Sequence, residues 1–319
     1  MTRVLVLLDD YQDVALGFAP WHELAGWDVR VLHDHHADDD ELVAALEDAT
    51  AVVAMRERTA FPRRVLQRLP RLELLITTGA ANASIDVGAA TELGVTVCGT
   101  RASATAAPEL SWALLMSAVR DIPGQQDALR AGDRWQTAVG RELCGRTLGI
   151  VGLGKIGTRM AGYARAFGMR VIAWSQNLTA DAARAADAEL VSKQELFERA
   201  DIATLHLRLS DRTRHVIGAT ELEALGTDGL LVNTARAGLV DTDALVAALH
   251  SGALGGAALD VFDEEPLPSD HPLLRTPRTL LTPHIGYVTR EQYAVFYRDA
   301  LEDVRAWAHG RPIRLISGR

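Results

Sequence analysis

Short apolar runs alternate with helical patterns along the first part of the chain. The runs have the length and composition of buried strands, and they lie at residues 4–8, 29–32, 51–54, 74–77 and 95–98. Stretches with apolar positions three and four residues apart lie between them, around residues 14–24, 40–46, 62–69 and 86–92. Regular alternation of strand and helix is typical of a parallel sheet covered on both faces. The pattern predicts an α/β domain over residues 1–98.

The alternation resumes beyond residue 99 and predicts a second, larger α/β domain. A helical pattern at 103–120 and a more polar stretch at 121–135 precede six strand-like runs, at residues 148–151, 171–174, 202–205, 230–232, 257–259 and 279–281. Two helix starts carry a predicted capping box, Ser192 with Glu195 and Thr289 with Gln292. The second box opens a helix over residues 289–309, whose apolar stripe is expected to pack on the first domain. The predicted domains are therefore 1–98 with 286–319, and 99–285.

A glycine-rich turn joins the first two strands of the second domain. Gly152, Gly154 and Gly157 form a G-x-G-x-x-G pattern between an apolar run and a helical pattern. In a dinucleotide-binding sheet the first glycine permits a tight turn, the second lets the backbone approach a pyrophosphate, and the third lets the helix pack on the strand. The N–H groups at the helix start attract the phosphates. The pattern predicts a Rossmann domain that binds a nicotinamide dinucleotide.

Ser175 stands where the fingerprint usually has an acidic residue. An Asp or Glu at the end of the second strand binds the ribose 2′-OH of NAD and repels a 2′-phosphate. Serine does neither, and no Arg or Lys follows at once in the sequence Trp174-Ser175-Gln176-Asn177. The cofactor is therefore predicted to be NAD or NADP, with the preference open.

Composition and charge exclude several classes of partner. The chain has 319 residues, 48% of them hydrophobic and 24% charged, and a net charge of −9. Such a charge argues against binding to nucleic acid or to acidic membranes. No signal peptide or membrane-spanning run is expected, because the apolar run after Met1 is short and ends at two acids. Two cysteines without metal-like spacing favour a reducing compartment, so a cytoplasmic protein is predicted.

Polar residues follow three late strands of the second domain. Arg236 follows the run 230–232, Asp260 and an acidic segment follow the next run, and His284 follows the last. The carboxyl ends of parallel strands meet at one edge of a sheet, where the nicotinamide is expected. There an arginine can bind a substrate carboxylate, and a protonated histidine can donate a proton as hydride reaches carbon. A neighbouring carboxylate favours the charged imidazole and orients it.

Two further turns could bind ligands. In the first domain, Arg56 could bind a carboxylate, and the turn Thr78-Gly79-Ala80-Ala81-Asn82 could offer N–H groups to a small anion. A solvated arginine and an ordinary glycine turn are the alternatives. The stretch His33-Asp34-His35-His36 has metal-ligand residue types, but a solvated loop before a helix with an acidic first turn explains it better. No metal site is predicted.

The chain resembles the D-isomer-specific 2-hydroxyacid dehydrogenases over almost its whole length. The likeness begins at the Gly79 turn with Asn82 and Asp86, and it includes GLGKIG at 152–157. Three longer motifs follow in the family's order and spacing: NTARAGLVD at 233–241, ALDVFDEEPLP at 258–268 and LTPHIGY at 281–287. The resemblance implies a Rossmann NAD(P)-binding domain inserted in a flavodoxin-like substrate domain, with a cleft that closes on the ligand. It also implies a homodimer.

The same resemblance implies a role for individual residues. Arg236 would bind the substrate, Glu265 would pair with the histidine, and His284 would be the general acid/base. Lys155 and Ile156 would line the pyrophosphate turn, Ser175 would face the adenosine ribose, and Asp260 the nicotinamide amide. The implied cofactor residues are Gly152, Gly154, Lys155, Ile156, Gly157, Ser175, His206, Thr234, Ala235, Asp260 and Gly286. The implied substrate residues are Arg56, Gly79, Ala80 and Ala81.

The expected reaction is hydride transfer between a nicotinamide dinucleotide and C2 of a small D-2-hydroxy acid or 2-oxo acid. A glyoxylate or hydroxypyruvate reductase is the nearest type, and alanines in the Gly79 turn leave room for larger acids. The alternative is a co-repressor of the same fold that senses NAD(H), although the chain has no evident interaction tails. The sequence does not decide the substrate or the physiological direction.

Overall fold

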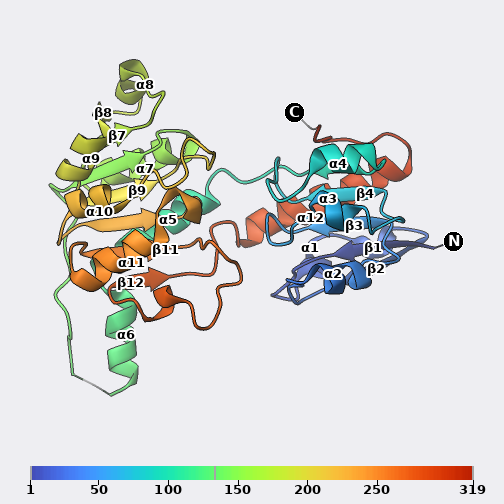
Figure 1. Ribbon diagram of the computed structural model, residues 1–319, viewed down its shortest axis with the longest axis horizontal. Coiled ribbons are helices and arrows are strands. Elements are labelled where there is room, and N and C mark those ends of the chain that lie inside the picture. The colour runs from blue at the N-terminus through green and yellow to red at the C-terminus, as the bar shows by residue number, and fades with distance from the viewer. Residues whose placement is uncertain (1, 133, 318–319) are drawn as a thin grey trace. The chain divides into compact units, whose positions relative to one another are not determined.

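The computed structural model describes residues 2–132 and 134–317, which form two compact units (Figure 1). The first unit comprises Met1–Ser103 and Val288–Arg319, and the second comprises Ala104–Tyr287. The chain leaves the first unit once and returns to it once. The sequence predicted these crossings after residues 98 and 285, and the compact units divide after Ser103 and Tyr287.

A parallel five-stranded sheet forms the centre of the first unit, in the order β2-β1-β3-β4-β5. Its strands are β1 (Arg3–Leu7), β2 (Trp27–Val31), β3 (Ala51–Ala54), β4 (Leu74–Thr77) and β5 (Thr96–Gly99). Its helices are α1 (Ala15–Phe18), η1 (Trp21–Glu23), α2 (Asp39–Ala45), α3 (Arg63–Leu66), α4 (Val87–Glu92) and α12 (Arg290–Ala308). The strand order is that of flavodoxin-like sheets, so the fold predicted for this domain is confirmed.

Helices cover both faces of this sheet. Val4, Val6 and Leu8 alternate along β1 and its end, and they pack with α2, α3 and α4 in one apolar cluster. The helix α12 contacts β4 and α1. Tyr293 and Phe296 of its apolar stripe are buried. The last helix therefore completes the core of the first unit, as its sequence pattern predicted.

The helix expected over residues 14–24 is wrong in its extent. The helix α1 ends before Ala19, which is extended, and a separate turn of 3-10 helix covers Trp21–Glu23. Pro20 explains the break, because the residue before a proline is disfavoured in the helical conformation. The apolar spacing continued through the proline and hid the interruption.

One predicted capping box is complete and the other is not. Ser192 and Glu195 exchange both hydrogen bonds at the start of α9 (Lys193–Arg199). At the start of α12, the Thr289 hydroxyl accepts the N–H of Gln292 at 3.1 Å. The Gln292 side chain, however, accepts the N–H of Ser103 at 2.6 Å instead of returning to Thr289. The second half of that predicted box is therefore wrong, because a tertiary partner replaced the local one.

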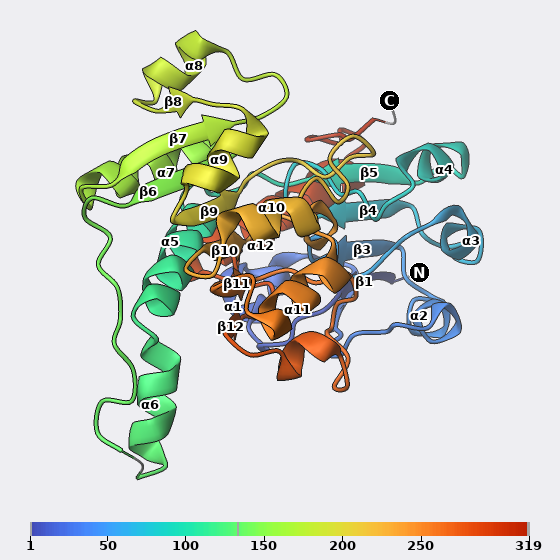
Figure 2. The same cartoon turned by 60° about the vertical axis from the view of Figure 1, so that its left-hand side comes forward.

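The second unit is built on a parallel seven-stranded sheet in the order β12-β11-β10-β9-β6-β7-β8 (Figure 2). Its strands are β6 (Thr147–Val151), β7 (Arg170–Trp174), β8 (Glu189–Leu190), β9 (Ile202–Leu205), β10 (Leu230–Asn233), β11 (Gly256–Leu259) and β12 (Thr279–Leu281). Its helices are α5 (Ala106–Val119), α6 (Ile122–Arg130), α7 (Lys155–Ala166), α8 (Ala180–Ala185), α9, α10 (Ala219–Leu225), η2 (Ala237–Leu239), α11 (Thr242–Ser251) and η3 (Pro272–Arg275). Counted from β8, the sheet has the Rossmann order 3-2-1-4-5-6 with β12 added, which confirms the predicted fold.

The prediction of six strands is wrong by one. The missing strand is β8, which has two residues, both exposed, and pairs with β7 at the edge of the sheet. An exposed strand of this length has no apolar run, so no pattern marks it. The strands β6, β9, β10 and β11 are buried along their whole length, and α9, α10 and α11 cover one face of the sheet with Phe197, Leu222 and Leu249. On the other face, α5 and α7 contribute Leu115 and Met160.

The polar stretch at 121–135, for which no element was predicted, contains the helix α6. Both views show α6 extending away from the sheet of the second unit (Figure 1, Figure 2). The helix has no buried residue, and its Ile122 and Leu129 are exposed, as are Trp135 and Val139 beyond it. The helix faces no core, so Ile122 and Leu129 stay exposed, and so short a helix in a polar stretch was not recognised from the sequence.

The helix α12 carries a fully buried carboxyl group, Asp303. Its Oδ1 accepts a hydrogen bond from Nε of Arg314 at 3.0 Å. Burial raises the pKa of Asp303 from 3.8 to about 7, against the attraction of Arg314 and with the repulsion of Asp299 and Glu302. A raised pKa means that the folded state holds this proton more tightly than the unfolded state. The stability contributed by Asp303 is therefore fully present below about pH 4 and is lost as the pH rises to about 7.

We expect the substitution Asp303→Asn to gain stability relative to wild type as the pH rises from about 4 to about 7. The amide keeps an oxygen for Arg314 and has no charge to bury. Thermal unfolding of both proteins across this pH range measures the difference. Glu302→Gln, at an exposed neighbour in contact with the same arginine, is the matched control and should show no comparable trend. A difference that stays constant or falls with pH would contradict the raised pKa.

Candidate active site

The three fingerprint glycines meet different surroundings at the end of β6. Gly152 has a φ of +101°, and a Cβ there would lie 2.8 Å from the carbonyl carbon of His206. A Cβ at Gly157 would overlap the carbonyl oxygen of Gly152. Gly154, in contrast, is the N-cap of α7, and a Cβ there would meet no described atom within 4 Å. Packing requires the first and third glycines, whereas the second leaves open space in front of a helix start.

This turn fits a dinucleotide pyrophosphate. Lys155 and Ile156 are the first residues of α7. No side chain among the described residues caps this helix start, so its N–H groups are open to a phosphate. Ser175 directly follows β7, the neighbouring strand. The structure adds one contact that the sequence did not suggest: the Gln176 amide donates to the carbonyl of Arg212 at 3.2 Å. A loop with exposed arginine thus borders the predicted ribose position.

Three further predicted cofactor positions are held by internal hydrogen bonds. His206 follows β9, and its Nε2 lies 2.9 Å from the hydroxyl of Thr204. Burial lowers the pKa of His206 to about 3, so its ring is neutral at physiological pH. Thr234 follows β10, and its hydroxyl lies 2.5 Å from that of Ser111 on α5. The next residue, Ala235, donates its N–H to the Asn233 side chain at 3.0 Å.

Asp260 organises the segment after β12. Its carboxylate is fully buried and accepts the hydroxyl of Thr282 at 2.6 Å and the N–H groups of Ile285 and Gly286 at 2.9 and 2.8 Å. Burial raises the pKa of Asp260, while these hydrogen bonds favour the charged form. Both carboxylate oxygens are engaged by the protein. The residue that the resemblance assigned to the nicotinamide therefore also fixes the loop that carries His284.

His284 and Glu265 form an imidazole–carboxylate pair. Nδ1 of His284 lies 2.6 Å from Oε2 of Glu265, and Oε1 of Glu265 accepts the N–H of Phe262 at 2.9 Å. The pair fixes Nδ1 as the protonated ring nitrogen. Within the described residues, Nε2 makes no hydrogen bond. His284 has a φ of +51°, in the left-handed region that few non-glycine residues adopt. The pairing was implied by sequence, but the backbone conformation was not.

Arg236 lies on the same edge of the sheet. It follows β10, while Glu265 follows β11 and His284 follows β12, and these three strands are neighbours in register. The carbonyl of Arg236 accepts the side-chain amide of Asn233 at 2.9 Å, and its Nη1 donates to the carbonyl of Ala235 at 2.7 Å. Asn233 is buried, so a side chain anchored in the core fixes the position of the backbone at Arg236. The structure thus brings the three predicted catalytic residues to one sheet edge.

The predicted substrate residues of the first unit also lie together. We call residues 78–82 the Gly79 turn. The backbone N–H of Arg56 donates to the Thr78 hydroxyl at 2.8 Å, and its Nη1 donates to the Thr78 carbonyl at 3.1 Å. The guanidinium lies over Gly79, where any Cβ would overlap Nη1. Ala80 and Ala81 are exposed beside it.

Asn82 is a contributor to this turn whose role sequence reasoning missed. Its amide nitrogen donates to the carbonyl of Arg56 and to the hydroxyl of Thr77, at 2.5 and 2.9 Å. Its oxygen accepts the N–H of Ser84 at 2.8 Å. A buried asparagine that uses both ends of its amide is a sign of a fixed turn. The residue therefore joins the Arg56 backbone to the Gly79 turn.

One cluster of metal-ligand residue types occurs within the described residues, formed by Asp10, Asp13 and His33. Nδ1 of His33 lies 3.2 Å from the carbonyl of Asp10. The carboxylate of Asp10 accepts the N–H groups of Val14 and Ala15 at 2.9 and 2.8 Å. Oδ2 of Asp10 therefore fixes the start of α1, while its buried Oδ1 has no hydrogen-bond partner among the described residues. The prediction of no metal site stays a prediction.

Comparison with known proteins shows the family of the chain. Residues 112–286 match the description of the D-isomer specific 2-hydroxyacid dehydrogenase NAD-binding domain. A glyoxylate reductase of Aeropyrum pernix is 39% identical over 263 residues, which cover 79% of this chain and 78% of the relative. A phosphoglycerate oxidoreductase structure from Vibrio cholerae is 39% identical with a TM-score of 0.92, and the match covers 97% of this chain and 100% of that one.

A third relative differs in length. The D-3-phosphoglycerate dehydrogenase of Methanocaldococcus jannaschii is 39% identical over 256 residues, which cover 79% of this chain and 48% of the relative. The chain therefore spans about half the length of that protein. The matched domain and the relatives agree on a nicotinamide dinucleotide cofactor and on oxidoreduction of 2-hydroxy and 2-oxo acids. This chain belongs to the family of D-isomer-specific 2-hydroxyacid dehydrogenases.

Proposed function

We propose that the protein reduces a small 2-oxo acid, of which glyoxylate is the first candidate, to the corresponding 2-hydroxy acid. The observation that carries this proposal is the pair of His284 and Glu265 on the sheet edge that also holds Arg236. The bound nicotinamide dinucleotide supplies the hydride that reduces C2. Nε2 of His284 gives its proton to the carbonyl oxygen of the substrate. Glu265 stabilises the protonated ring, and the Arg236 guanidinium binds the substrate carboxylate.

The substrate class rests on the first unit and on the relatives. Arg56 and the Gly79 turn supply a guanidinium and the exposed backbone of Ala80 and Ala81, which suit a carboxylate with a small substituent. A relative that covers most of the chain is named a glyoxylate reductase. Phosphoglycerate enzymes are the second candidates, because the relatives with this name are equally similar. The co-repressor alternative is not favoured, since these relatives are named as reductases and dehydrogenases.

Initial rates with a panel of acids test the proposal. Glyoxylate, hydroxypyruvate, pyruvate and 3-phosphohydroxypyruvate would each be supplied with NADH and with NADPH, and the loss of cofactor absorbance followed. We expect turnover with glyoxylate or hydroxypyruvate at a kcat/KM at least about 10⁴ M⁻¹s⁻¹, the lower range for enzymes on their own substrates. Turnover confined to the phosphorylated acid would replace the first candidate with the second. Tight cofactor binding without any turnover would contradict reductase activity.

We also propose that the cofactor site admits NADPH. Ser175 carries no negative charge at the ribose position, and the loop of Arg212 contacts its neighbour Gln176. The substitution Ser175→Asp should lower kcat/KM for NADPH by about tenfold or more, because a carboxylate repels the 2′-phosphate and binds the 2′-OH. The value for NADH should stay within a few fold. An unchanged ratio of the two values would contradict the role of Ser175.

Assembly and location stay predictions. A homodimer is expected from the resemblance, and the exposed apolar residues on and after α6, including Trp135 and Val139, are a suitable contact surface. None of the helices in the described ranges is long and apolar enough to cross a bilayer. A cytoplasmic location is proposed on the cysteine usage of the sequence.

A further inference from the structure

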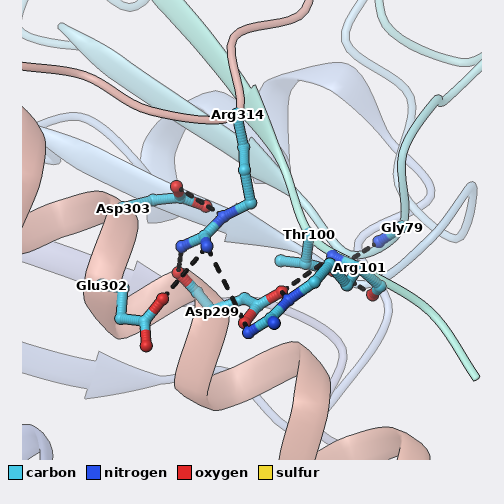
Figure 3. Close-up of polar contacts among 7 residues, drawn as sticks. All are labelled: Gly79, Thr100, Arg101, Asp299, Glu302, Asp303 and Arg314. Carbon is cyan, nitrogen blue, oxygen red and sulfur yellow. Dashed lines mark hydrogen bonds and ion pairs between the residues drawn. The ribbon is translucent and has the colours of Figure 1, made fainter.

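We propose that Thr100 and Arg101 are positioning residues, which hold the Gly79 turn in the conformation that binds the substrate carboxylate and are themselves held by Asp299 of α12. The inference rests on the proposed function, because it deepens the role of the Gly79 turn. All the residues involved belong to the first unit, and Figure 3 draws their contacts.

Thr100 binds both backbone polar groups of Gly79. The N–H of Gly79 donates to the Thr100 hydroxyl at 2.7 Å, and the N–H of Thr100 donates to the Gly79 carbonyl at 2.9 Å. Gly79 has a φ of +99°, a value that glycine adopts without strain, but glycine can also adopt many other backbone conformations. The two hydrogen bonds with Thr100 hold Gly79 in this one. Thr100 is buried, so water does not replace these bonds.

This arrangement determines which N–H groups can meet an anion. The N–H of Gly79 is already used, whereas those of Ala80 and Ala81 make no hydrogen bond to any described residue. Both alanines are exposed. The anion site of the turn is therefore formed by the two residues after Gly79, and their direction depends on how Gly79 is held.

Asp299 fixes the next residue, Arg101. The Thr100 hydroxyl donates to the Arg101 carbonyl at 3.0 Å. The backbone N–H and Nε of Arg101 donate to one carboxylate oxygen of Asp299 at 2.8 and 3.0 Å, and Nη2 donates to the other at 2.6 Å. The Asp299 side chain is 0% exposed and that of Arg101 is 72% exposed. An exposed arginine thus reaches inward to a buried carboxylate, and the hydrogen bonds set the backbone at residue 101.

The C-terminal segment closes the arrangement from the other side. Arg314 donates to the carbonyl of Asp299 at 2.7 Å, and its own carbonyl accepts the N–H of Gly99 at 3.0 Å. A Cβ at Gly99 would lie 2.6 Å from the Gly79 carbonyl oxygen and 2.9 Å from Ile316. There is no space for the turn to move toward β5. Burial alone would raise the pKa of Asp299, but the bonds from Arg101 and the charge of Arg314 lower it, so the pair stays ionised.

The substitution Thr100→Val tests the role of the hydroxyl. Valine has nearly the same shape but neither accepts from Gly79 nor donates to residue 101. We expect KM for glyoxylate to rise about 10-fold to 100-fold, with kcat reduced less than about 3-fold and the Kd of NADH unchanged. Thr100→Ser restores the hydroxyl and should recover a KM near that of wild type. A KM within about twofold of wild type in Thr100→Val would overturn the inference.

Arg101→Met and Asp299→Asn provide a second test should Thr100→Val fail to fold. Each should raise KM about 3-fold to 10-fold with kcat maintained. Arg305→Met is the matched control. Arg305 lies on α12, as Asp299 does, but it pairs with Glu23 at the surface. It should leave KM unchanged. Equal effects in Arg305→Met and Arg101→Met would assign the change to the stability of α12 and overturn the positioning role.

Hydrogen–deuterium exchange gives a readout that needs no turnover. Thr100→Val should speed exchange in the peptide that contains the Gly79 turn, while peptides of β1 keep the wild-type rate. If wild-type protein reduced no acid of the panel, the proposed function would fail, and the exchange rate would still decide whether Thr100 holds the turn. If Thr100→Val showed faster exchange but an unchanged KM in an active enzyme, Thr100 would be a structural contact only, and the positioning role would be overturned.

Discussion

Replacing His284 with asparagine is expected to lower kcat for 2-oxo acid reduction by about 10²–10⁴-fold, the usual contribution of a positioned general acid. Asparagine fills much of the space, and its side-chain N–H can still donate one hydrogen bond to the Glu265 carboxylate. It has no proton that it can give to a developing alkoxide. The effect should appear in kcat, because the substrate carboxylate is held by other groups.

Cofactor binding separates this result from unfolding. The glycine turn before α7 lies at the end of a different strand, β6, so the Kd of NADH measured by fluorescence should not change. His250→Asn is the control, since His250 is an exposed residue in the last turn of α11. An enzyme with asparagine at position 284 that kept more than about a tenth of the wild-type kcat would rule out His284 as the proton donor.

Removal of the Arg236 guanidinium is expected to have an effect of similar size on kcat/KM. A bidentate arginine–carboxylate pair makes two charge-assisted hydrogen bonds, each worth about 1.5–3 kcal/mol. Arg236→Ala should therefore lower kcat/KM by about 10²–10⁴-fold. Arg236→Lys should lie between alanine and wild type, because an ammonium group keeps the charge but loses the planar pair of donors.

The backbone around residue 236 should survive these changes. Its carbonyl accepts the Asn233 amide whichever side chain follows. Arg275→Ala, at the exposed last residue of η3, controls for loss of positive charge in the same unit. A fall in KM alone, or equal losses in the control, would contradict a direct contact between Arg236 and the substrate.

The sequence predicted those features correctly in which a residue type is required for a single physical reason. Strands buried on both faces required unbroken apolar runs, and these runs located the two sheets. The fingerprint glycines were readable because each had a mechanical role, and the structure explains Gly152 and Gly157 by close backbone contacts. The predicted catalytic residues lie on one sheet edge because β10, β11 and β12 are neighbours.

Features without a local pattern were not predictable. The strand β8 is too short and too exposed to form an apolar run, and α6 has no core to face. The pair of Arg101 and Asp299 joins residues 198 positions apart, so nothing near either residue announces the other. The position of the Arg56 guanidinium over Gly79 likewise depends on β3 and β4 lying side by side. Long-range contacts of this kind follow from the fold, and the fold had to be known first.

The return of the chain to its first unit has a consequence for biosynthesis. Residues 104–287 form an uninterrupted unit, whereas residues 1–103 cannot complete their unit until α12 has been synthesised. About 200 residues separate Ser103 from the end of this helix, so at 5–20 residues per second a ribosome needs roughly 10–40 s to supply it. During this time the face of β4 that α12 covers has no partner. The nascent chain therefore completes its nucleotide-binding half first, and the earlier-made half is the one exposed to chaperones and to aggregation.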